Sequence, residues 1–216
     1  MTDHDTPLIS VIIPTKDRSA LLGQALASAA ELARSGLKLE LIVVDNGSTD
    51  ATLTVASSFQ ARIVRAPVPG AAAARNAGMR AATGDYLAFL DDDDVWLAGH
   101  LRPHIDLLEQ NPTMAAVVGQ VQTADFDLNP IGLPWPAVTA PRQDPFHMFL
   151  RQYPQIGATV VRASVRESVG DFDETLVGDE DWDWHLRLAL RHDVGFVRTP
   201  CVLFRQRPIA VGAEME

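Results

Sequence analysis

The stretch Asp85-Tyr-Leu-Ala-Phe-Leu-Asp-Asp-Asp-Asp94 joins a short apolar run to four consecutive aspartates. A short run that is almost entirely apolar predicts a strand buried on both faces of a parallel sheet. Four adjacent carboxylates repel one another, and either solvent or a bound cation can offset that repulsion. Because charge runs are commonly solvated loops, the acidic cluster by itself leaves both interpretations open.

Strand and helix patterns alternate on both sides of this stretch. Apolar, β-branched runs predict strands at residues 8–13, 39–44, 61–65, 85–90 and 114–121. Apolar spacings of three and four, with turn residues before them, predict helices at 21–32, from about 50 to 59, at 70–82 and at 99–110. This alternation predicts an α/β fold with a mostly parallel central sheet and helices on both faces.

The pattern changes after residue 121. Residues 122–145 contain five prolines and no clear periodicity, which predicts a long loop. Further regular structure is predicted at residues 145–151, 157–162 and 182–191, followed by two short closing strands at 194–198 and 202–205. No repeat or linker divides the 216 residues, and this length favours one domain over residues 1–216.

Composition excludes several classes of protein. The chain is 47% hydrophobic and 21% charged, with a net charge of −10, so nucleic acid is not an expected partner. No apolar run approaches the ~18 residues of a membrane span, and we expect no transmembrane segment. Residues 1–7 lack the basic start of a signal peptide, and the single cysteine, Cys201, suits a reducing cytoplasm.

Polar clusters follow three of the predicted strands. They are Pro14-Thr-Lys-Asp17, Asp45-Asn-Gly-Ser-Thr-Asp50 and Asp91–Asp94. Because ligands collect at the carboxyl ends of parallel strands, we expect the three clusters to line one crevice. Asp91 and Asp93 are two apart, so at a strand end they would share a face and could hold Mg²⁺ or Mn²⁺.

Two further residues are candidates for the chemistry. Arg75 lies in an alanine-rich helical stretch, where small neighbours leave room for a phosphate, although such an arginine alone is more typical of a surface ion pair. Asp181 and His185 are four apart and share a helix face, and Asp181 is a candidate general base. Its neighbours Asp179 and Glu180 are more typical of an acidic run that caps a helix.

Other motifs are absent or weak. The chain has neither the glycine-rich dinucleotide fingerprint nor a P-loop. His100 and His104 are four apart, but Pro103 lies between them and no third ligand follows, so we predict surface histidines rather than zinc ligands. Cys201 lies in an apolar stretch, which predicts a packed thiol rather than a nucleophile.

Five motifs, in their order and spacing, resemble those of the family-two inverting glycosyltransferases with the GT-A fold. The resemblance extends over residues 8–205, nearly the whole chain. The motifs are Ser10-Val-Ile-Ile-Pro-Thr15, Val43-Val-Asp-Asn-Gly-Ser-Thr-Asp50, Ala74-Arg-Asn-Ala-Gly78, Gly84-Asp-Tyr-Leu-Ala-Phe-Leu-Asp-Asp-Asp-Asp94 and Glu180-Asp-Trp-Asp-Trp-His-Leu-Arg187.

The resemblance implies transfer of a sugar from a nucleotide-diphospho-sugar, of uridine or thymidine type, to a hydroxyl acceptor such as a lipid-linked glycan. It implies Mn²⁺ or Mg²⁺ held by Asp93 with Asp91, and Asp181 as the catalytic base. Residues 8–121 would form the donor and metal half, and residues 122–205 the acceptor half, in a cytoplasmic enzyme at or near the inner face of the membrane. The expected nucleotide-sugar contacts are Pro14, Thr15, Asp45, Asn46, Arg75, Asp91 and Asp92.

The chain departs from the family pattern at three places. Asn46 stands where a second carboxylate is frequent, Lys16 replaces a frequent aromatic residue, and no histidine follows Arg205-Gln-Arg207 as a late metal ligand. A binding module of the same fold without turnover is therefore an alternative. A nucleotidyltransferase or an aspartate-based phosphoryl-transfer enzyme is a third, which Pro14-Thr-Lys-Asp17 disfavours because it supplies no phosphate loop.

Overall fold

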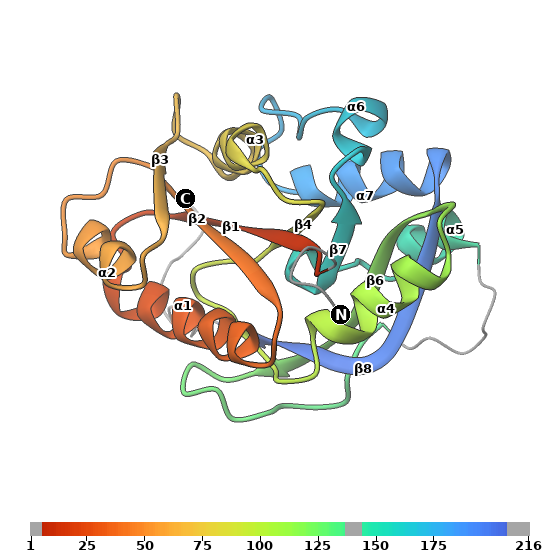
Figure 1. Cartoon of the computed structure of the whole chain (residues 1–216), viewed down its shortest axis with the longest axis horizontal. Coiled ribbons are helices and arrows are strands. Elements are labelled where there is room, and N and C mark those ends of the chain that lie inside the picture. Colours follow the sequence, from red (N-terminus) through yellow and green to blue (C-terminus); the bar gives the residue numbers. More distant parts are fainter. Residues whose placement is uncertain (1–5, 137–143, 207–216) are drawn as a thin grey trace, which may run out of the picture.

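A single twisted sheet forms the centre of the molecule (Figure 1). The computed structural model describes residues 6–136 and 144–206, and within them eight strands lie in the order β3-β2-β1-β4-β7-β6-β8-β5. The strands are β1 (Leu8–Thr15), β2 (Lys38–Asp45), β3 (Arg62–Arg65), β4 (Tyr86–Phe89), β5 (Val95–Trp96), β6 (Met114–Ala124), β7 (Thr159–Arg162) and β8 (Asp193–Arg205).

The sheet is mostly parallel, as predicted. β1 pairs in parallel with both β2 and β4, β2 pairs in parallel with β3, and β6 pairs in parallel with β8. β7 runs antiparallel between β4 and β6, and the short β5 runs antiparallel to β8. The carboxyl ends of β1, β2 and β4 therefore meet at one edge, where the three polar clusters follow.

Helices cover both faces of the sheet (Figure 1). On one face lie α1 (Ser19–Arg34), α2 (Thr52–Ser58) and α4 (Leu101–Gln110). The other face is covered by α3 (Ala71–Ala81), α5 (Pro145–Arg151), α6 (Val165–Val169) and α7 (Glu180–Arg191). A short 3-10 turn, η1 (Ile156–Ala158), precedes β7.

Helix α1 illustrates how the sequence pattern produces this packing. Its buried residues, spaced three and four apart, form one apolar stripe against the sheet. The stripe consists of Leu22, Ala25, Leu26, Ala29 and Leu32. On the opposite face, α3 lies so close to the sheet that a Cβ on Gly78 would be 2.3 Å from Cγ2 of Ile12. Only glycine permits this approach without a shift of the strand or helix.

The second half differs from the prediction in several elements. β6 continues to Ala124, so residues 122–124 are strand rather than loop. The two predicted closing strands are one long strand, β8, and α6 was not expected. In the first half, the two-residue strand β5 was not expected either. Residues 125–136 return along β6, where Trp135 and Val121 exchange backbone hydrogen bonds of 2.9 and 2.6 Å. Residues 137–143 of the predicted loop lie outside the described residues.

The two histidines of α4 also correct the prediction. His100 and His104 are fully buried instead of lying at the surface. Pro103 is the third residue of α4, in the first turn, where its missing N–H has no helical partner to lose. Cys201 is buried, as predicted. Among the described residues, no helix combines the length and the apolar character that a membrane crossing needs.

Candidate active site

A pocket of about 420 Å³, called the acidic pocket below after the aspartates Asp91–Asp93 that line it, opens where β1, β2 and β4 end. Residues from all three polar clusters line it, together with the start of α3. The lining residues are Pro14, Thr15, Lys16, Arg18, Asn46, Pro69, Gly70, Ala71, Arg75, Asp91, Asp92 and Asp93. The expected crevice at the strand ends is therefore present.

The four aspartates form a turn rather than the end of a strand. β4 ends at Phe89, and the N–H of Asp94 donates to the carbonyl oxygen of Asp91 at 3.1 Å. We expected Asp91 and Asp93 to share one face of a strand, and this was wrong. Side chains alternate between two faces only in extended backbone, and these residues lie in a turn. Both residues nevertheless line the pocket, with 24% and 14% of their side chains exposed.

Asp92 is held on the inner side of this turn. Its carboxylate accepts hydrogen bonds from Oγ1 of Thr15 at 2.7 Å and from Arg18 at 2.7 Å. Burial raises its pKa, although both partners favour the charged form. The same Arg18 group lies 3.3 Å from Oδ2 of Asp93. Arg18 thus links the acidic turn to the end of β1. The sequence motifs did not predict Arg18 as a site residue.

Arg75 is buried and bridges two elements that are far apart in the sequence. Its guanidinium donates to Asp91 at 2.8 Å and to Glu180, at the start of α7, at 2.5 Å. Burial disfavours the charged guanidinium, but Asp91, Asp181 and Glu180 together raise its pKa. Arg75 is therefore not a surface ion pair, and Glu180 is a site residue rather than only a helix cap. Nε of Arg75 is buried without a hydrogen-bond partner.

The buried residues Asp94 and Gln155 stabilise the turn formed by Asp91–Asp94. The side-chain amide of Gln155 donates to Asp94 at 3.3 Å and lies 3.5 Å from Asp91. The backbone N–H of Arg205 donates to Asp94 at 2.9 Å, and its Nε donates to the carbonyl oxygen of Asp93 at 2.6 Å. Burial raises the pKa of Asp94 well above its usual range. These contacts fix the turn from the end of β8.

Asp45 and Asn46 have different positions. The buried Asp45 carboxylate accepts from the N–H of Ser48 at 2.9 Å, so it stabilises the turn after β2 and is not among the pocket residues. Asn46 does line the pocket, and its Oδ1 is buried without a hydrogen-bond partner. An acceptor left unpaired at a pocket wall is suited to a donor group of a ligand.

Asp181 is the second residue of α7 and is 7% exposed. Burial raises its pKa, while Arg75 and the hydroxyl of Tyr153, which donates to Oδ1, lower it. The N–H of Trp182 also donates to Oδ1, at 2.9 Å. Asp181 does not line the acidic pocket itself. It lies within electrostatic reach of Arg75, Glu180 and Asp91.

The carboxylates that line the pocket fit a hard divalent cation. Asp91 and Asp93 offer carboxylate oxygens, the ligands that Mg²⁺ and Mn²⁺ prefer. Lys16, Arg18 and Arg75 place three cationic side chains around the same space. One or two carboxylates combined with ligand phosphates form a common magnesium site, and the basic groups suit the remaining phosphate charge.

The structure brings most of the expected residues together. Pro14, Thr15, Asn46, Arg75, Asp91, Asp92 and Asp93 share the pocket, Asp45 stabilises its edge, and Asp181 lies next to Arg75. The sequence reasoning missed Arg18, Glu180, Tyr153 and Gln155. Arg18 had a weak signal, since it directly follows the cluster after β1. No local signal marks Tyr153 or Gln155, which reach the site through long-range contacts. Arg207 and the residues after it, where the family pattern has its late histidine and this chain has none, lie outside the described residues.

Comparisons with known proteins agree with this geometry. The family model described as glycosyl transferase family 2 matches residues 10–167. An uncharacterized glycosyltransferase of Haemophilus influenzae is 33% identical over 133 residues, 59% of this chain and 52% of that protein. The Escherichia coli UDP-Glc:alpha-D-GlcNAc-diphosphoundecaprenol beta-1,3-glucosyltransferase WfgD is 32% identical over 111 residues, 50% of this chain and 43% of that protein. The chain thus spans about half the length of these relatives.

Solved structures share the fold at low sequence identity. S. aureus TarS 1–349 in complex with UDP-GlcNAc has a TM-score of 0.72 and 18% identity, over 92% of this chain and 58% of TarS. The mannosyltransferase PcManGT from Pyrobaculum calidifontis, in complex with GDP-Man and Mn²⁺, has a TM-score of 0.67 and 22% identity, over 96% of this chain and 59% of that protein.

Proposed function

Because the chain belongs to glycosyl transferase family 2 and has the GT-A fold, we propose that it transfers a sugar from a nucleotide-diphospho-sugar to a hydroxyl acceptor with inversion. Membership of the family makes it a glycosyltransferase; the inversion, the metal and the substrates are the proposal. The observation that carries it is the convergence of Asp91, Asp93 and Arg75 in one pocket beside the buried carboxylate of Asp181.

The pocket would bind the donor through its nucleotide and diphosphate. Lys16, Arg18 and Arg75 suit the diphosphate, and the unpaired Oδ1 of Asn46 suits an N–H or hydroxyl of the base or ribose. An amide both donates and accepts, so Asn46 does not itself select one base. A uridine or thymidine donor stays our first expectation. The TarS complex holds UDP-GlcNAc and the PcManGT complex holds GDP-Man, so guanosine donors belong in the same test.

Asp93, with Asp91, would hold Mg²⁺ or Mn²⁺ against the diphosphate. When bound, the ion would offset the charge that develops on the nucleoside diphosphate as it leaves. Arg75 would have a second role, because its ion pairs with Asp91 and Glu180 fix the distance between the metal-binding turn and α7. Asp92 and Asp94 would position the turn through their buried hydrogen bonds rather than contact the ion.

Asp181 would take the proton from the acceptor hydroxyl. Among the described residues, both hydrogen bonds to its carboxylate end on Oδ1, so Oδ2 is the oxygen available for proton transfer. Burial raises its pKa, and a raised pKa makes a carboxylate a stronger base. The acceptor oxygen would attack the anomeric carbon in one displacement, which inverts its configuration and needs no covalent sugar–enzyme intermediate.

In this proposal residues 8–121 form the donor half of one domain, and residues 122–205 form the acceptor half that carries Asp181. A lipid-linked glycan is the acceptor class we favour, because the similar E. coli enzyme is named for a GlcNAc-diphosphoundecaprenol acceptor. Action at the inner face of a membrane, from the cytoplasm, belongs to the same proposal. The free, buried thiol of Cys201 is in keeping with a reducing compartment.

A donor panel tests the function. The protein is incubated with uridine, thymidine and guanosine diphospho-sugars, each with Mn²⁺, Mg²⁺ or a chelator. We expect metal-dependent thermal stabilisation and slow release of nucleoside diphosphate with at least one donor. No response with any donor would contradict the proposal. Stabilisation by a donor, without release or transfer to any acceptor, would favour the binding module over the enzyme.

A further inference from the structure

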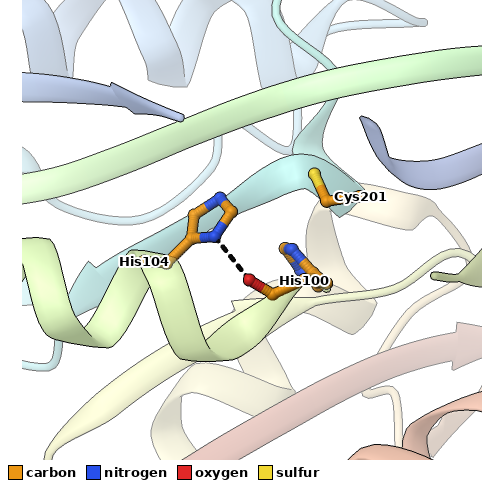
Figure 2. Close-up of side chains that lie close together, drawn as sticks. All are labelled: His100, His104 and Cys201. Atoms are coloured by element: carbon orange, nitrogen blue, oxygen red, sulfur yellow. Dashed lines mark hydrogen bonds between the residues drawn. The ribbon is translucent and has the colours of Figure 1, made fainter. Parts of the chain in front are cut away.

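Two histidines and the only cysteine of the chain meet inside the hydrophobic core (Figure 2). His100 lies just before α4, His104 lies in its first turn, and Cys201 lies in β8. All three are fully buried, and none lines the acidic pocket. In the part of the chain that the structure describes, they form the only such group of His, Cys, Asp or Glu whose ligand atoms lie within 4.8 Å of one another.

The first observation beyond this grouping is that His100 has no hydrogen bond to either ring nitrogen. Burial lowers its pKa well below the usual range, so the ring is neutral and carries one N–H and one lone pair. Its ring packs at 4.7 Å from Trp96 and 4.6 Å from His104, centroid to centroid. Leaving a buried polar group unpaired is energetically unfavourable, so a partner for His100 is expected.

The second observation concerns the tautomer of His104. Nδ1 lies 2.8 Å from the carbonyl oxygen of His100, and Nε2 lies 3.3 Å from the carbonyl oxygen of Ala158. Burial lowers its pKa to about 4, so only one nitrogen carries a proton at neutral pH. If Nδ1 donates across the shorter distance, the lone pair of Nε2 faces another acceptor. A cation bound to Nε2 would remove this repulsion between two acceptors. A metal-bound histidine typically donates its other ring N–H to a backbone carbonyl or a carboxylate, as Nδ1 of His104 would donate to His100.

The third observation is the space beside Gly119. A Cβ at this position would lie 2.3 Å from Sγ of Cys201 and 3.0 Å from Nε2 of His104. Glycine therefore keeps open the space in which the thiol and this nitrogen converge. The carbonyl oxygen of Gln120, 3.1 Å from Sγ, adds another acceptor at the same place.

We propose that His100, His104 and Cys201 bind one Zn²⁺ ion as a structural site that fastens α4 to β8. Two imidazole nitrogens and one thiolate are donors that zinc prefers, in contrast to the carboxylates of the acidic pocket. A backbone carbonyl, from Ala158 or Gln120, is available as a further oxygen ligand. Ligand atoms in a tetrahedral zinc site are roughly 3.5 Å apart, so the three side chains would draw together by about 1 Å.

Zinc binding requires the thiolate. Burial raises the pKa of Cys201, so the thiol is protonated in the metal-free protein, and coordination forms the S–Zn bond while the S–H proton leaves to solvent. Because the site is buried, the ion would enter as the chain folds. The site shares no residue with the acidic pocket, so its test is independent of the donor assay.

Refolding with cobalt tests the site directly. The full chain is unfolded, refolded under reducing conditions with one equivalent of Co²⁺ and excess Mg²⁺, and its absorption spectrum is recorded. We expect thiolate-to-cobalt absorption in the near ultraviolet, which only Cys201 can produce because the chain has one cysteine. One equivalent of Zn²⁺ should displace the cobalt and abolish this absorption.

Variants complete the test. Cys201→Ser should abolish the absorption, and His104→Gln should weaken zinc binding at least ~10-fold. His147→Gln is the control, because His147 is an exposed histidine beside Asp144 and should not matter. Absence of thiolate-to-cobalt absorption in the wild-type protein would overturn the proposal. So would equal zinc content in wild type and Cys201→Ser, which would indicate adventitious binding at exposed groups.

Discussion

The hydroxyl of Tyr153 donates a hydrogen bond to Oδ1 of Asp181. Tyr153 lies between α5 and η1, and its ring packs 5.8 Å from that of Trp182, so the phenol is held against the start of α7. Burial raises the pKa of Tyr153, and the negative charge of Asp181 raises it further, so the hydroxyl stays protonated and acts as a donor. Tyr153 thus orients the proposed base and stabilises its charged form.

We predict that Tyr153→Phe shifts the acid limb of the kcat–pH profile to higher pH. Loss of the hydroxyl removes an interaction that lowers the pKa of Asp181, so that pKa rises further. The carboxylate is the active form, and activity is lost as pH falls through its pKa, so a higher pKa moves the loss upward. The phenylalanine ring keeps the packing against Trp182. An acid limb that does not move would contradict this role of Tyr153.

Asp181→Asn should separate binding from turnover. The amide keeps the size of the side chain but cannot take a proton, so we expect kcat to fall ~10²–10⁴-fold. Donor affinity, measured by titration calorimetry, should stay within ~2-fold, because Asp181 does not line the pocket. Asp183→Asn is a matched control on the same helix, since that carboxylate pairs with Arg187 at 2.8 Å. Full turnover by Asp181→Asn would exclude it as the base.

Asp93→Asn should abolish the metal dependence of donor binding. Removing one carboxylate charge weakens the proposed ion site, so donor affinity with Mn²⁺ should fall to that measured with a chelator. The thermal midpoint without donor should change little, because Asp93 lines the pocket and 14% of its side chain stays exposed. Asp127→Asn, at an exposed aspartate of the segment after β6, should behave as wild type. Metal-dependent binding that persists in Asp93→Asn would assign the ion to other ligands.

Gly78→Ala should destabilise the fold without touching the proposed chemistry. The added methyl would lie 2.3 Å from Cγ2 of Ile12 and 3.2 Å from Cγ2 of Val44, both in the sheet. We expect the free energy of unfolding in urea to fall by ~1–3 kcal/mol, as for other overpacked cores. Gly99→Ala is the control, because its nearest neighbour would be 4.0 Å away, and its effect should stay within ~0.5 kcal/mol. Equal effects of the two substitutions would refute the packing argument.

Most of the first half of the fold was predictable, because β1, β2 and β4 contain short apolar runs bounded by turn residues. β8 was not, because Pro200 interrupts its pattern and suggested two strands. The strand continues because its pairing with β6 shifts register around Gln120, opposite that proline, and proline is tolerated at such irregularities. The burial of His100 and His104 had no local signal either, since tertiary packing covers them.

The site was predictable only where the fold itself places residues. Asp91 and Asp93 follow a strand, so the rule for parallel sheets located them. The contact of Arg75 with Glu180 joins residues 105 apart in the sequence, and the contact of Tyr153 with Asp181 joins residues 28 apart. No spacing rule links such pairs, because their meeting depends on how α3, α5 and α7 pack on the same face of the sheet.

His185 should make the protein less stable in acid. It is fully buried one turn after Asp181, with Nδ1 at 2.7 Å from the carbonyl oxygen of that residue, and burial lowers its pKa to about 3. In the unfolded chain a histidine titrates near 6.5. Below that pH, His185 is therefore protonated in the unfolded state but stays neutral in the folded state. The free energy of unfolding should therefore fall as pH drops from about 6.5 toward 3, by up to ~1.4 kcal/mol per pH unit from this residue.

Urea unfolding of wild type and His185→Gln between pH 7 and pH 4 isolates this contribution. Glutamine cannot titrate, so the variant should start less stable and the gap to wild type should narrow as pH falls. Buried carboxylates with raised pKa values, such as Asp94 and Asp181, act in the opposite direction but contribute equally to both proteins unless the substitution perturbs them. A gap that stays constant for His185→Gln would mean that His185 protonates in the folded protein as readily as in the unfolded chain.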